Sequence, residues 1–284
     1  MQTQSRKFTE RSVVIVGVGL IGGSIAAAVR KRFPECKVIG IGRNRERLKA
    51  ATARGLLTDW SDRISAASIP DRSLGIVCLP VDRIVEAVQQ LVAAGCELVT
   101  DAGSVKASLY ADLDKVYGER FVGSHPIAGS EHTGFEHADA DLFVGRLCVV
   151  TPMHATAADT ERVVAFWKSV GSTVQKMSAD EHDRVLALTS HLPHVIAAVV
   201  SGCVAEEFLS FTGTGYRDTT RIAAGSASLW TSILLGNATH CVESIDAAQQ
   251  LLQRFREAIT TGDAATLESL LEASAQRRRS LKRE

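Results

Sequence analysis

The first 178 residues alternate between short apolar runs and longer segments of mixed polarity. Short runs rich in Val and Ile are typical of strands buried on both faces of a sheet. The predicted strands are the runs 13–16, 37–42, 74–80, 97–101, one beginning at 121, 145–151 and 173–177. The predicted helices between them include 25–30, 45–54, 84–94 and 157–169. This alternation predicts an α/β fold with a doubly wound parallel sheet of the Rossmann type.

The pattern changes at residue 179. No strand-like run follows, and apolar residues recur at the spacing of one helix face, as at Leu251, Leu252, Phe255 and Ile259. We therefore predict a dinucleotide-binding domain over 1–178 and an all-helical domain over 179–284. We expect the helical domain to supply a second wall of the site and the interface of a homodimer.

A glycine motif follows the first predicted strand. Gly17, Gly19 and Gly22 have the Gly-x-Gly-x-x-Gly spacing, and helix formers come next. Strand, glycine turn and helix in this order favour dinucleotide binding over a turn that binds nothing. The N–H groups at the start of the helix, around Leu20 and Ile21, would face the pyrophosphate.

The end of the second predicted strand indicates which nucleotide is bound. NAD-preferring folds usually carry Asp or Glu here to hold the ribose 2′-hydroxyl. This chain has Gly42, followed by Arg43, Asn44 and Arg45. Arginine can bind a 2′-phosphate through charge-assisted hydrogen bonds. The sequence therefore favours NADP, with NAD possible if the arginines are ordinary surface charges.

Composition narrows the function classes. Lys+Arg and Asp+Glu both number 32, which argues against a nucleic acid or membrane partner. No apolar run is expected to span a bilayer, and the polar first eleven residues lack the core of a signal peptide. The six cysteines are scattered without a Cys-x-x-Cys pair. We expect a cytoplasmic protein with reduced thiols and no metal site.

Several candidate residues follow the predicted strands, at the sheet edge where ligands bind in such folds. Pro80 ends one strand, and Asp101, Gly103 and Ser104 follow the next. All but Ser104 are candidate cofactor contacts, although a helix cap is the favoured interpretation for Asp101. For Ser104, capping and ligand contact are equally supported.

A loop after the strand that begins at 121 carries His125, Ser130 and Glu131 between glycines. A histidine exchanges protons near neutral pH, since its unperturbed pKa is about 6.5. The position at a strand end, the rigid His-Pro step and the nearby Glu131 favour a functional histidine over a polar surface residue.

The first long helix of the second half contains His191, Pro193 and His194. Proline should kink the helix, because it lacks a backbone donor. The two histidines share a face, but no acidic third ligand accompanies them, so we predict no metal. His191 is the candidate substrate contact, and His194 is expected to be a partly buried structural residue.

Arg221 follows a glycine-rich loop, 213–215, that is predicted to open a helix capped by Asp218, Thr219 or Thr220. A cation in a first helical turn is disfavoured by the helix dipole. That placement indicates a partner, either a substrate carboxylate bound by the guanidinium or the side chain of Asp218.

Taken together, these motifs resemble the prephenate/arogenate dehydrogenase family of tyrosine biosynthesis over nearly the whole chain. The glycine motif is shared by many dehydrogenases, whereas the other blocks are more specific. The matching blocks are Val-Gly-Leu-Ile-Gly-Gly-Ser (18–24), Thr-Asp-Ala-Gly-Ser-Val-Lys (100–106), Gly-Ser-His-Pro-Ile-Ala-Gly-Ser-Glu (123–131), Ser-His-Leu-Pro-His (190–194) and Asp-Thr-Thr-Arg-Ile-Ala (218–223).

The resemblance implies an oxidoreductase that passes hydride from a ring carbinol to a nicotinamide cofactor, after which the ring loses CO₂ and becomes aromatic. By resemblance, His125 takes the hydroxyl proton and Ser104 orients the hydroxyl and the histidine. His191 would contact substrate, and Arg221 would bind a substrate carboxylate. Ser130 and Glu131 would line the pocket and influence side-chain selection.

Three alternatives stay open at this point. Prephenate is favoured as substrate, but arogenate differs only in its side chain, and Glu131 could favour the arogenate ammonium. A related dehydrogenase that uses a catalytic lysine in its helical domain is disfavoured, because only Lys282 follows Lys176. A non-catalytic NADP-binding sensor would need neither His125 nor Arg221.

Overall fold

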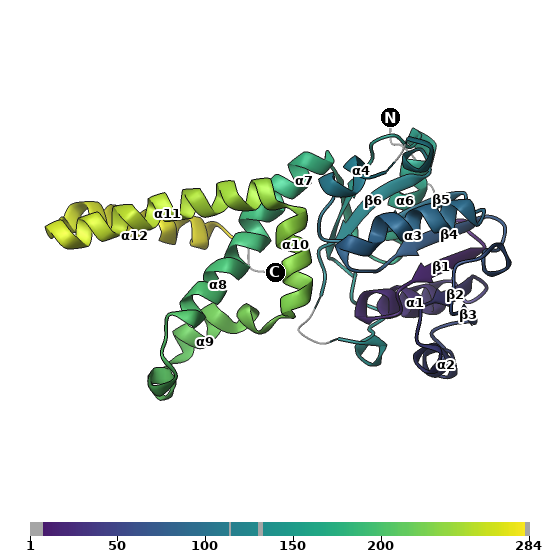
Figure 1. The fold of residues 1–284 in the computed structure, drawn as a ribbon, viewed down its shortest axis with the longest axis horizontal. Helices are drawn as coiled ribbons and strands as arrows, with labels where there is room; N and C mark the ends of the chain where they lie inside the picture. Colours follow the sequence, from purple (N-terminus) through teal and green to yellow (C-terminus); the bar gives the residue numbers. More distant parts are fainter. Residues whose placement is uncertain (1–7, 114, 130–132, 282–284) are drawn as a thin grey trace. The chain divides into compact units, whose positions relative to one another are not determined.

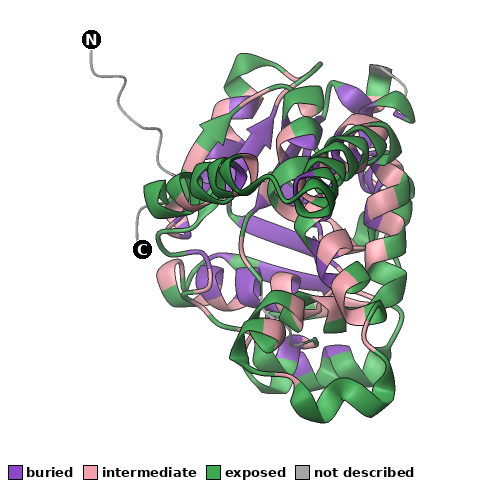
Figure 2. Cartoon of the chain, turned by 90° about the vertical axis from the view of Figure 1, so that its left-hand side faces the viewer, coloured by how far each residue is buried: buried purple, intermediate pink, exposed green. Residues whose placement is uncertain are grey.

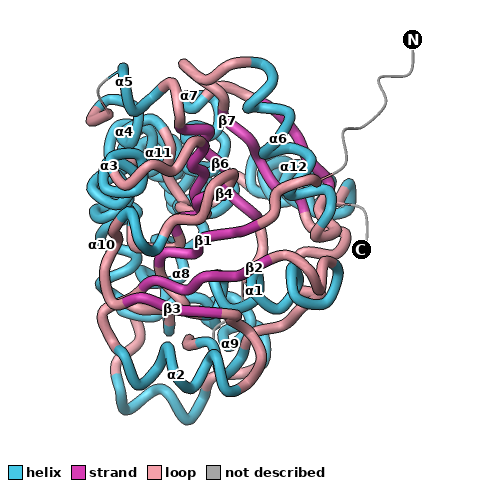
Figure 3. The backbone as a smooth tube through the Cα atoms, turned by 90° about the vertical axis from the view of Figure 1, so that its right-hand side faces the viewer, coloured by secondary structure: helices cyan, strands magenta, loops and turns pink. Residues whose placement is uncertain are grey.

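A single eight-stranded sheet organises the N-terminal part of the chain (Figures 1 and 3). The computed structural model describes residues 8–113, 115–129 and 133–281. The strand order is β3-β2-β1-β4-β5-β6-β7-β8. The strands are β1 (Ser12–Val16), β2 (Lys37–Ile41), β3 (Asp59–Ser61), β4 (Ser73–Val77), β5 (Leu98–Asp101), β6 (Phe121–Pro126), β7 (Leu147–Thr151) and β8 (Thr173–Lys176).

The predicted fold class is confirmed, with two differences. β7 pairs with β6 in antiparallel orientation, whereas the other neighbouring strands pair in parallel. β3 was not predicted, because three partly exposed residues give too short a pattern. The strand order reverses between β1 and β4, and such a switch point opens the crevice in which doubly wound sheets bind ligands.

Helices cover both faces of this sheet, because alternate residues of each strand point to opposite faces. On β1, Val13 and Ile15 belong to one apolar cluster and Val14 and Val16 to another. The first cluster includes residues of α1 (Leu20–Arg32), α2 (Arg45–Ala53) and α6 (Ala157–Ser169). The second includes residues of α3 (Ile84–Ala93) and α4 (Ala107–Ala111). The strands between these layers are largely buried (Figure 2).

From residue 179 the described chain is helical, as predicted. The whole chain divides into two compact units, Met1–Asn237 and Ala238–Glu284. Because this division falls within the helices, the predicted boundary after residue 178 stays a prediction. The helices are α7 (Ala179–Leu186), α8 (Leu192–Gly202), α9 (Thr214–Thr220) and α10 (Ala227–Gly236) in the first unit, and α11 (Ala238–Thr261) and α12 (Ala264–Ser280), packed against each other, in the second.

Two of these helices lie at the ligand-binding edge of the sheet. α7 packs against α4 and β7, and α10 packs against the short 3₁₀ helix Val81–Arg83 that follows β4. Ile233 of α10 is buried in the same apolar cluster as Val81. The start of the helical region is therefore fixed to the carboxyl ends of the strands, where the candidate residues converge.

The predicted irregularity at Pro193 takes the form of a π-helical segment. Residues Ala187–His191 form π-helix between α7 and α8, and Pro193 occupies the first turn of α8. A proline in the first turn lacks only an N–H that would have no intrahelical partner. The widened turn before it is the kind of local adjustment that often marks functional sites.

The expectation that no apolar run is long enough to span a bilayer is wrong. Ala179–Gly202 is a helical stretch long and apolar enough to cross a membrane by length and composition. Hydrogen bonds from His182 and Asp183 nevertheless join this stretch to β6 and α4. We interpret it as a helix of the folded first unit.

Candidate active site

The glycine turn after β1 has the geometry of a nucleotide cradle. Gly17 has φ +96°, and a Cβ there would collide with the carbonyl oxygen of Cys78. A Cβ at Gly22 would collide with the carbonyl oxygen of Gly17. Gly19 precedes α1 and has open space around it. The N–H groups at the start of α1 can therefore be approached by a phosphate.

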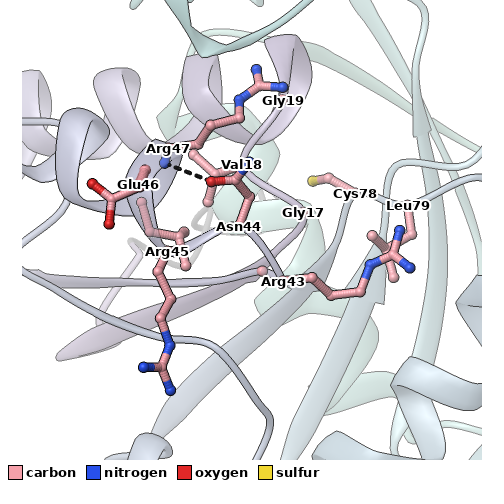
Figure 4. A pocket seen from close by; sticks show the side chains of 12 residues that line it. Gly17, Val18, Gly19, Arg43, Asn44, Arg45, Glu46, Arg47, Cys78 and Leu79 are labelled. Atoms are coloured by element: carbon pink, nitrogen blue, oxygen red, sulfur yellow. Dashed lines mark hydrogen bonds between the residues drawn. The ribbon is translucent and has the colours of Figure 1, made fainter.

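A cavity of about 740 Å³ adjoins this turn (Figure 4). It is lined by Gly17–Gly19 after β1, by residues 42–48 between β2 and the start of α2, and by Cys78 and Leu79 after β4. The predicted cofactor residues Leu20 and Ile21 lie in the first turn of α1 and are half-buried, and Pro80 is exposed after β4. The residues present fit a dinucleotide, because the cavity joins an open helix N-terminus to the ends of three parallel strands.

The polar residues after β2 differ in their internal partners. The Asn44 side chain accepts a hydrogen bond from the Arg47 N–H at 3.0 Å and caps α2. Arg45 pairs with Asp62, at 2.6 Å from Nε to Oδ2. Arg43 forms no ion pair with the described residues and lines both this cavity and a neighbouring one of about 680 Å³. Its guanidinium is thus available to a ligand in this cavity.

His125 was expected in a loop, but it is the fifth residue of β6, because the strand extends through Pro126. Its side chain belongs to a hydrogen-bonded series of three side chains. Nδ1 of His125 is 2.9 Å from Nε2 of His182. Nδ1 of His182 is in turn 2.7 Å from Oδ1 of Asp183. The Asp183 carboxylate accepts the backbone N–H groups of Lys106, at 2.9 Å, and Ala107, at 2.8 Å. These hydrogen bonds connect α7 to both β6 and the start of α4.

A buried ion pair lies beside this chain. The Lys106 ammonium contacts the Asp101 carboxylate, and both side chains are fully buried. Asp101 also accepts the N–H groups of Gly103, at 2.8 Å, and Ser124, at 2.9 Å. The predicted helix cap at Asp101 is therefore wrong. Its carboxylate has internal partners, so its predicted contact with the cofactor stays a prediction.

The environment of His125 keeps its imidazole neutral. Burial lowers its pKa well below 6.5, and the neighbouring His182, Lys106 and His191 lower it further. Burial also lowers the pKa of His182, against the opposing effect of Asp183. A neutral imidazole at physiological pH has a nitrogen lone pair that can accept a proton.

Ser104 is half-buried in the turn between β5 and α4. It does not cap α4, whose N-cap position is Lys106 without a side-chain cap. Asp183 supplies the acceptor instead, since it receives two N–H groups at that helix start. Of the two interpretations of Ser104, contact with a ligand stays a prediction and capping is excluded.

The two histidines around Pro193 have different surroundings. His191 is 1% exposed, and its Nδ1 is 3.2 Å from the Asn237 amide. His194 stacks on Trp230 with ring centroids 3.5 Å apart, and its buried Nδ1 has no hydrogen-bond partner within the described chain. The predicted substrate contact through His191 and the predicted structural role of His194 stay predictions. Among the described residues, no group of three or more His, Cys, Asp and Glu could hold a metal ion.

Arg221 was predicted near the start of a helix capped by residues 218–220, but it follows the end of helix α9. Asp218, Thr219 and Thr220 are the last residues of α9, so their predicted capping role is wrong. Arg221 begins the 3₁₀ helix Arg221–Ala224, which packs against α8. Its side chain is exposed and forms no ion pair with Asp218 or with other residues that the structure describes. Two further candidates, Ser130 and Glu131, lie outside the described residues.

Four parts of this arrangement were missed from the sequence: His182, Asp183, Lys106 as a buried cation, and the His194 Nδ1 without a partner among the described residues. An available signal was the adjacent base and acid, His182 and Asp183, in the first helix after the sheet. Their partners lie 57 and 77 positions away in the chain, so only the fold brings them together.

Comparisons with known proteins cover both halves of the chain. Two family models match in succession: "Prephenate dehydrogenase, nucleotide-binding domain" over residues 25–176 and "Prephenate dehydrogenase, dimerization domain" over residues 178–273. The prephenate dehydrogenase of Bacillus subtilis is 32% identical over 268 residues, covering 90% of this chain and 72% of that protein. The cyclohexadienyl dehydrogenase of Zymomonas mobilis is 32% identical over 283 residues, covering 96% of each chain.

Solved structures show the same likeness. Prephenate dehydrogenase of Aquifex aeolicus, in complex with hydroxyphenyl propionate and NAD+, matches with TM-score 0.88 and 31% identity over 96% of this chain and 99% of that one. Arogenate dehydrogenase of Synechocystis matches with TM-score 0.81 and 25% identity, over 94% and 99%. With its glycine cradle, its neutral histidine and these matches over both halves, the chain belongs to the prephenate dehydrogenase family of tyrosine biosynthesis enzymes.

Proposed function

We propose that this chain is a prephenate dehydrogenase that oxidises prephenate to 4-hydroxyphenylpyruvate and CO₂ with NADP. The observation that carries the proposal is the neutral His125, held by His182 near the carboxyl end of β6, in the same sheet as the glycine turn after β1. When bound, the nicotinamide would accept hydride from the ring carbon that bears the hydroxyl. Loss of hydride develops positive charge at that carbon, which removal of the hydroxyl proton relieves.

The residues of the chain have separate tasks in this proposal. His125 accepts the hydroxyl proton as the hydride departs. Ser104 orients the hydroxyl. Its side chain is half-buried and is not used to cap α4. Arg221 binds a substrate carboxylate, since its exposed guanidinium is unpaired within the described chain. His194, whose Nδ1 lacks a described partner, adds a polar contact to the substrate, and both His194 and the buried His191 lie next to Trp230.

Turnover in a grid of two substrates and two cofactors tests the proposal. Prephenate and arogenate are each offered with NADP and with NAD, and formation of reduced nicotinamide is followed by absorbance. The highest kcat/KM is expected with prephenate and NADP. Higher kcat/KM with arogenate would establish the alternative activity. Cofactor binding without turnover in all four combinations would contradict both and identify a sensor.

NADP is favoured over NAD because of two features after β2. Gly42 presents no carboxylate to repel a 2′-phosphate, and Arg43 offers a guanidinium that the described residues leave unpaired. Figure 4 shows the Arg43 side chain extending toward Leu79 along this cavity. A charge-assisted hydrogen bond contributes about 1.5–3 kcal/mol, or roughly 10–100-fold in affinity.

Gly42→Asp is expected to reverse the cofactor preference. The new carboxylate would repel the 2′-phosphate and accept the NAD 2′-hydroxyl, so KM for NADP should rise by about 10–100-fold and KM for NAD should fall. A Cβ at residue 42 has only an ordinary 3.7 Å contact with Leu48, so the side chain fits. Gly42→Ala is the matched control and should leave both constants near wild type. An unchanged ratio of the two KM values in Gly42→Asp would contradict NADP recognition at this position.

The proposed partner is a second copy of this chain. One matched family model is a dimerization domain, and the second unit exposes large apolar side chains on both of its helices. These side chains are Val242, Leu251, Leu252, Ile259 and Leu271. We expect sedimentation equilibrium to give twice the chain mass at micromolar concentration, and Leu252→Glu to shift the protein toward monomer. A wild-type monomer at that concentration would contradict the dimer.

The proposed location is the cytoplasm. All six cysteines are free in the structure, and reducing compartments maintain free thiols.

A further inference from the structure

We infer that His182 and Asp183 are positioning residues that hold His125 as its Nδ1–H tautomer, so that Nε2 is the atom that receives the substrate proton. This inference rests on the proposed function for its kinetic consequence, but not for the tautomer itself. Backbone N–H groups can only donate, so they fix the direction of each further hydrogen bond toward the substrate.

Asp183 fixes the first proton. Its Oδ1 accepts the Lys106 N–H and its Oδ2 accepts the Ala107 N–H, and backbone N–H groups can only donate. The carboxylate also lies at the start of α4, where negative charge is stabilised by the helix dipole. An Asn237 amide donates to the Asp183 carbonyl oxygen at 2.7 Å and fixes the backbone behind it. Asp183 therefore acts as an acceptor toward His182.

His182 fixes the second proton. Its Nδ1, 2.7 Å from Asp183 Oδ1, must carry hydrogen to donate. A neutral ring with hydrogen on Nδ1 has a lone pair on Nε2. That lone pair faces Nδ1 of His125 at 2.9 Å, so the hydrogen between the two rings belongs to His125. The remaining nitrogen of His125, Nε2, is then the unprotonated one.

This arrangement accounts for every hydrogen in the proton transfer. The hydroxyl proton moves to Nε2 of His125, while the hydrogen already on Nδ1 stays in its bond to His182. The imidazolium that forms is stabilised by the His182 lone pair and, beyond it, by the Asp183 charge. With the opposite tautomer, Nε2 would carry hydrogen and could not accept the proton. In serine proteases a wrong tautomer of the catalytic histidine lowers kcat by about 10⁴-fold.

Two variants of His182 separate hydrogen bonding from packing. Leucine at residue 182 removes the acceptor, whereas glutamine can place an amide oxygen near the position of Nε2. We expect His182→Leu to lower kcat by about 10²–10⁴-fold with little change in KM for the cofactor. His182→Gln should recover most of that loss. A kcat of His182→Leu within threefold of wild type, or equal losses in both variants, would overturn the positioning role.

NMR of protein labelled with ¹⁵N at histidine measures the tautomer without turnover. The His125 signal is identified by its loss in His125→Asn. Wild-type protein should show hydrogen on Nδ1 and a bare Nε2. A wild-type His125 with hydrogen on Nε2 would overturn the inference even if the enzyme is active. If prephenate and arogenate both fail to react, the proposed function fails, but this spectrum still decides the tautomer.

Discussion

Replacing His125 by asparagine is expected to lower kcat by about 10²–10⁴-fold, the usual contribution of a general base. Asparagine has no basic nitrogen, so the hydroxyl proton loses its acceptor while the nucleotide cavity, which His125 does not line, is unchanged. Steady-state kinetics should therefore show a large fall in kcat with prephenate, and titration with NADP should show wild-type affinity.

His154→Asn is the matched control for this prediction, since His154 is an exposed histidine of the same unit. Its kcat should equal that of wild type. If His125→Asn retained more than a tenth of wild-type kcat, His125 would not be the base, and the proposed mechanism would need another proton acceptor.

The pH dependence of kcat/KM gives a second view of the same histidine. A base must be deprotonated to act, and the environment of His125 lowers its pKa well below 6.5, chiefly by burial. Activity should therefore persist as the pH falls through 6.5 and decline only below it. This decline at low pH, the acid limb of the profile, should be absent from the residual activity of His125→Asn. A wild-type limb centred at or above pH 6.5 would contradict the assignment.

The sequence predicted the sheet because its signals are local. Continuous apolar runs such as 13–16 can be buried on both faces only if helices cover both, and parallel strands bring their carboxyl ends to one edge. That reasoning placed Ser104 and His125 at the same edge. The antiparallel direction of β7 could not be predicted in this way, because an apolar run such as 147–151 has the same pattern in either direction.

The interactions behind His125 could not be predicted, because they are non-local. Nothing in the residues around His182 indicates that its partner is on β6. Lysine is almost never fully buried unless it is paired, so Lys106 reads as a surface residue until Asp101 is found beside it. Local capping patterns were wrong for a similar reason. Asp101 and Ser104 precede α4, yet the acceptor for that helix start comes from Asp183, on another helix.

The buried pair between Lys106 and Asp101 provides the largest expected effect on stability. Lys106→Met keeps an unbranched side chain of similar size but leaves the Asp101 carboxylate fully buried without its cation. Breaking a buried ion pair from one side costs about 3–5 kcal/mol of unfolding free energy. Urea denaturation should therefore give a much lower midpoint for Lys106→Met than for wild type.

Lys176→Met is the matched control, because Lys176 forms an ion pair with Glu161 in which both side chains are about half exposed. Such surface pairs contribute about 0–1 kcal/mol. Lys106→Met combined with Asp101→Asn should recover part of the loss, since it removes the unpaired charge. Equal midpoints for Lys106→Met and Lys176→Met would contradict a stabilising role of the buried pair.

The same substitution should also change catalysis in a defined direction. Positive charge on Lys106 lowers the pKa of His125, and its removal leaves the negative charge of Asp101 uncompensated nearby. Both changes favour protonated His125, so the acid limb of kcat/KM should move to higher pH in Lys106→Met at temperatures where the variant is folded. Lys176→Met should leave the limb in place. An unshifted limb in Lys106→Met would contradict an effect of the Lys106 charge on His125.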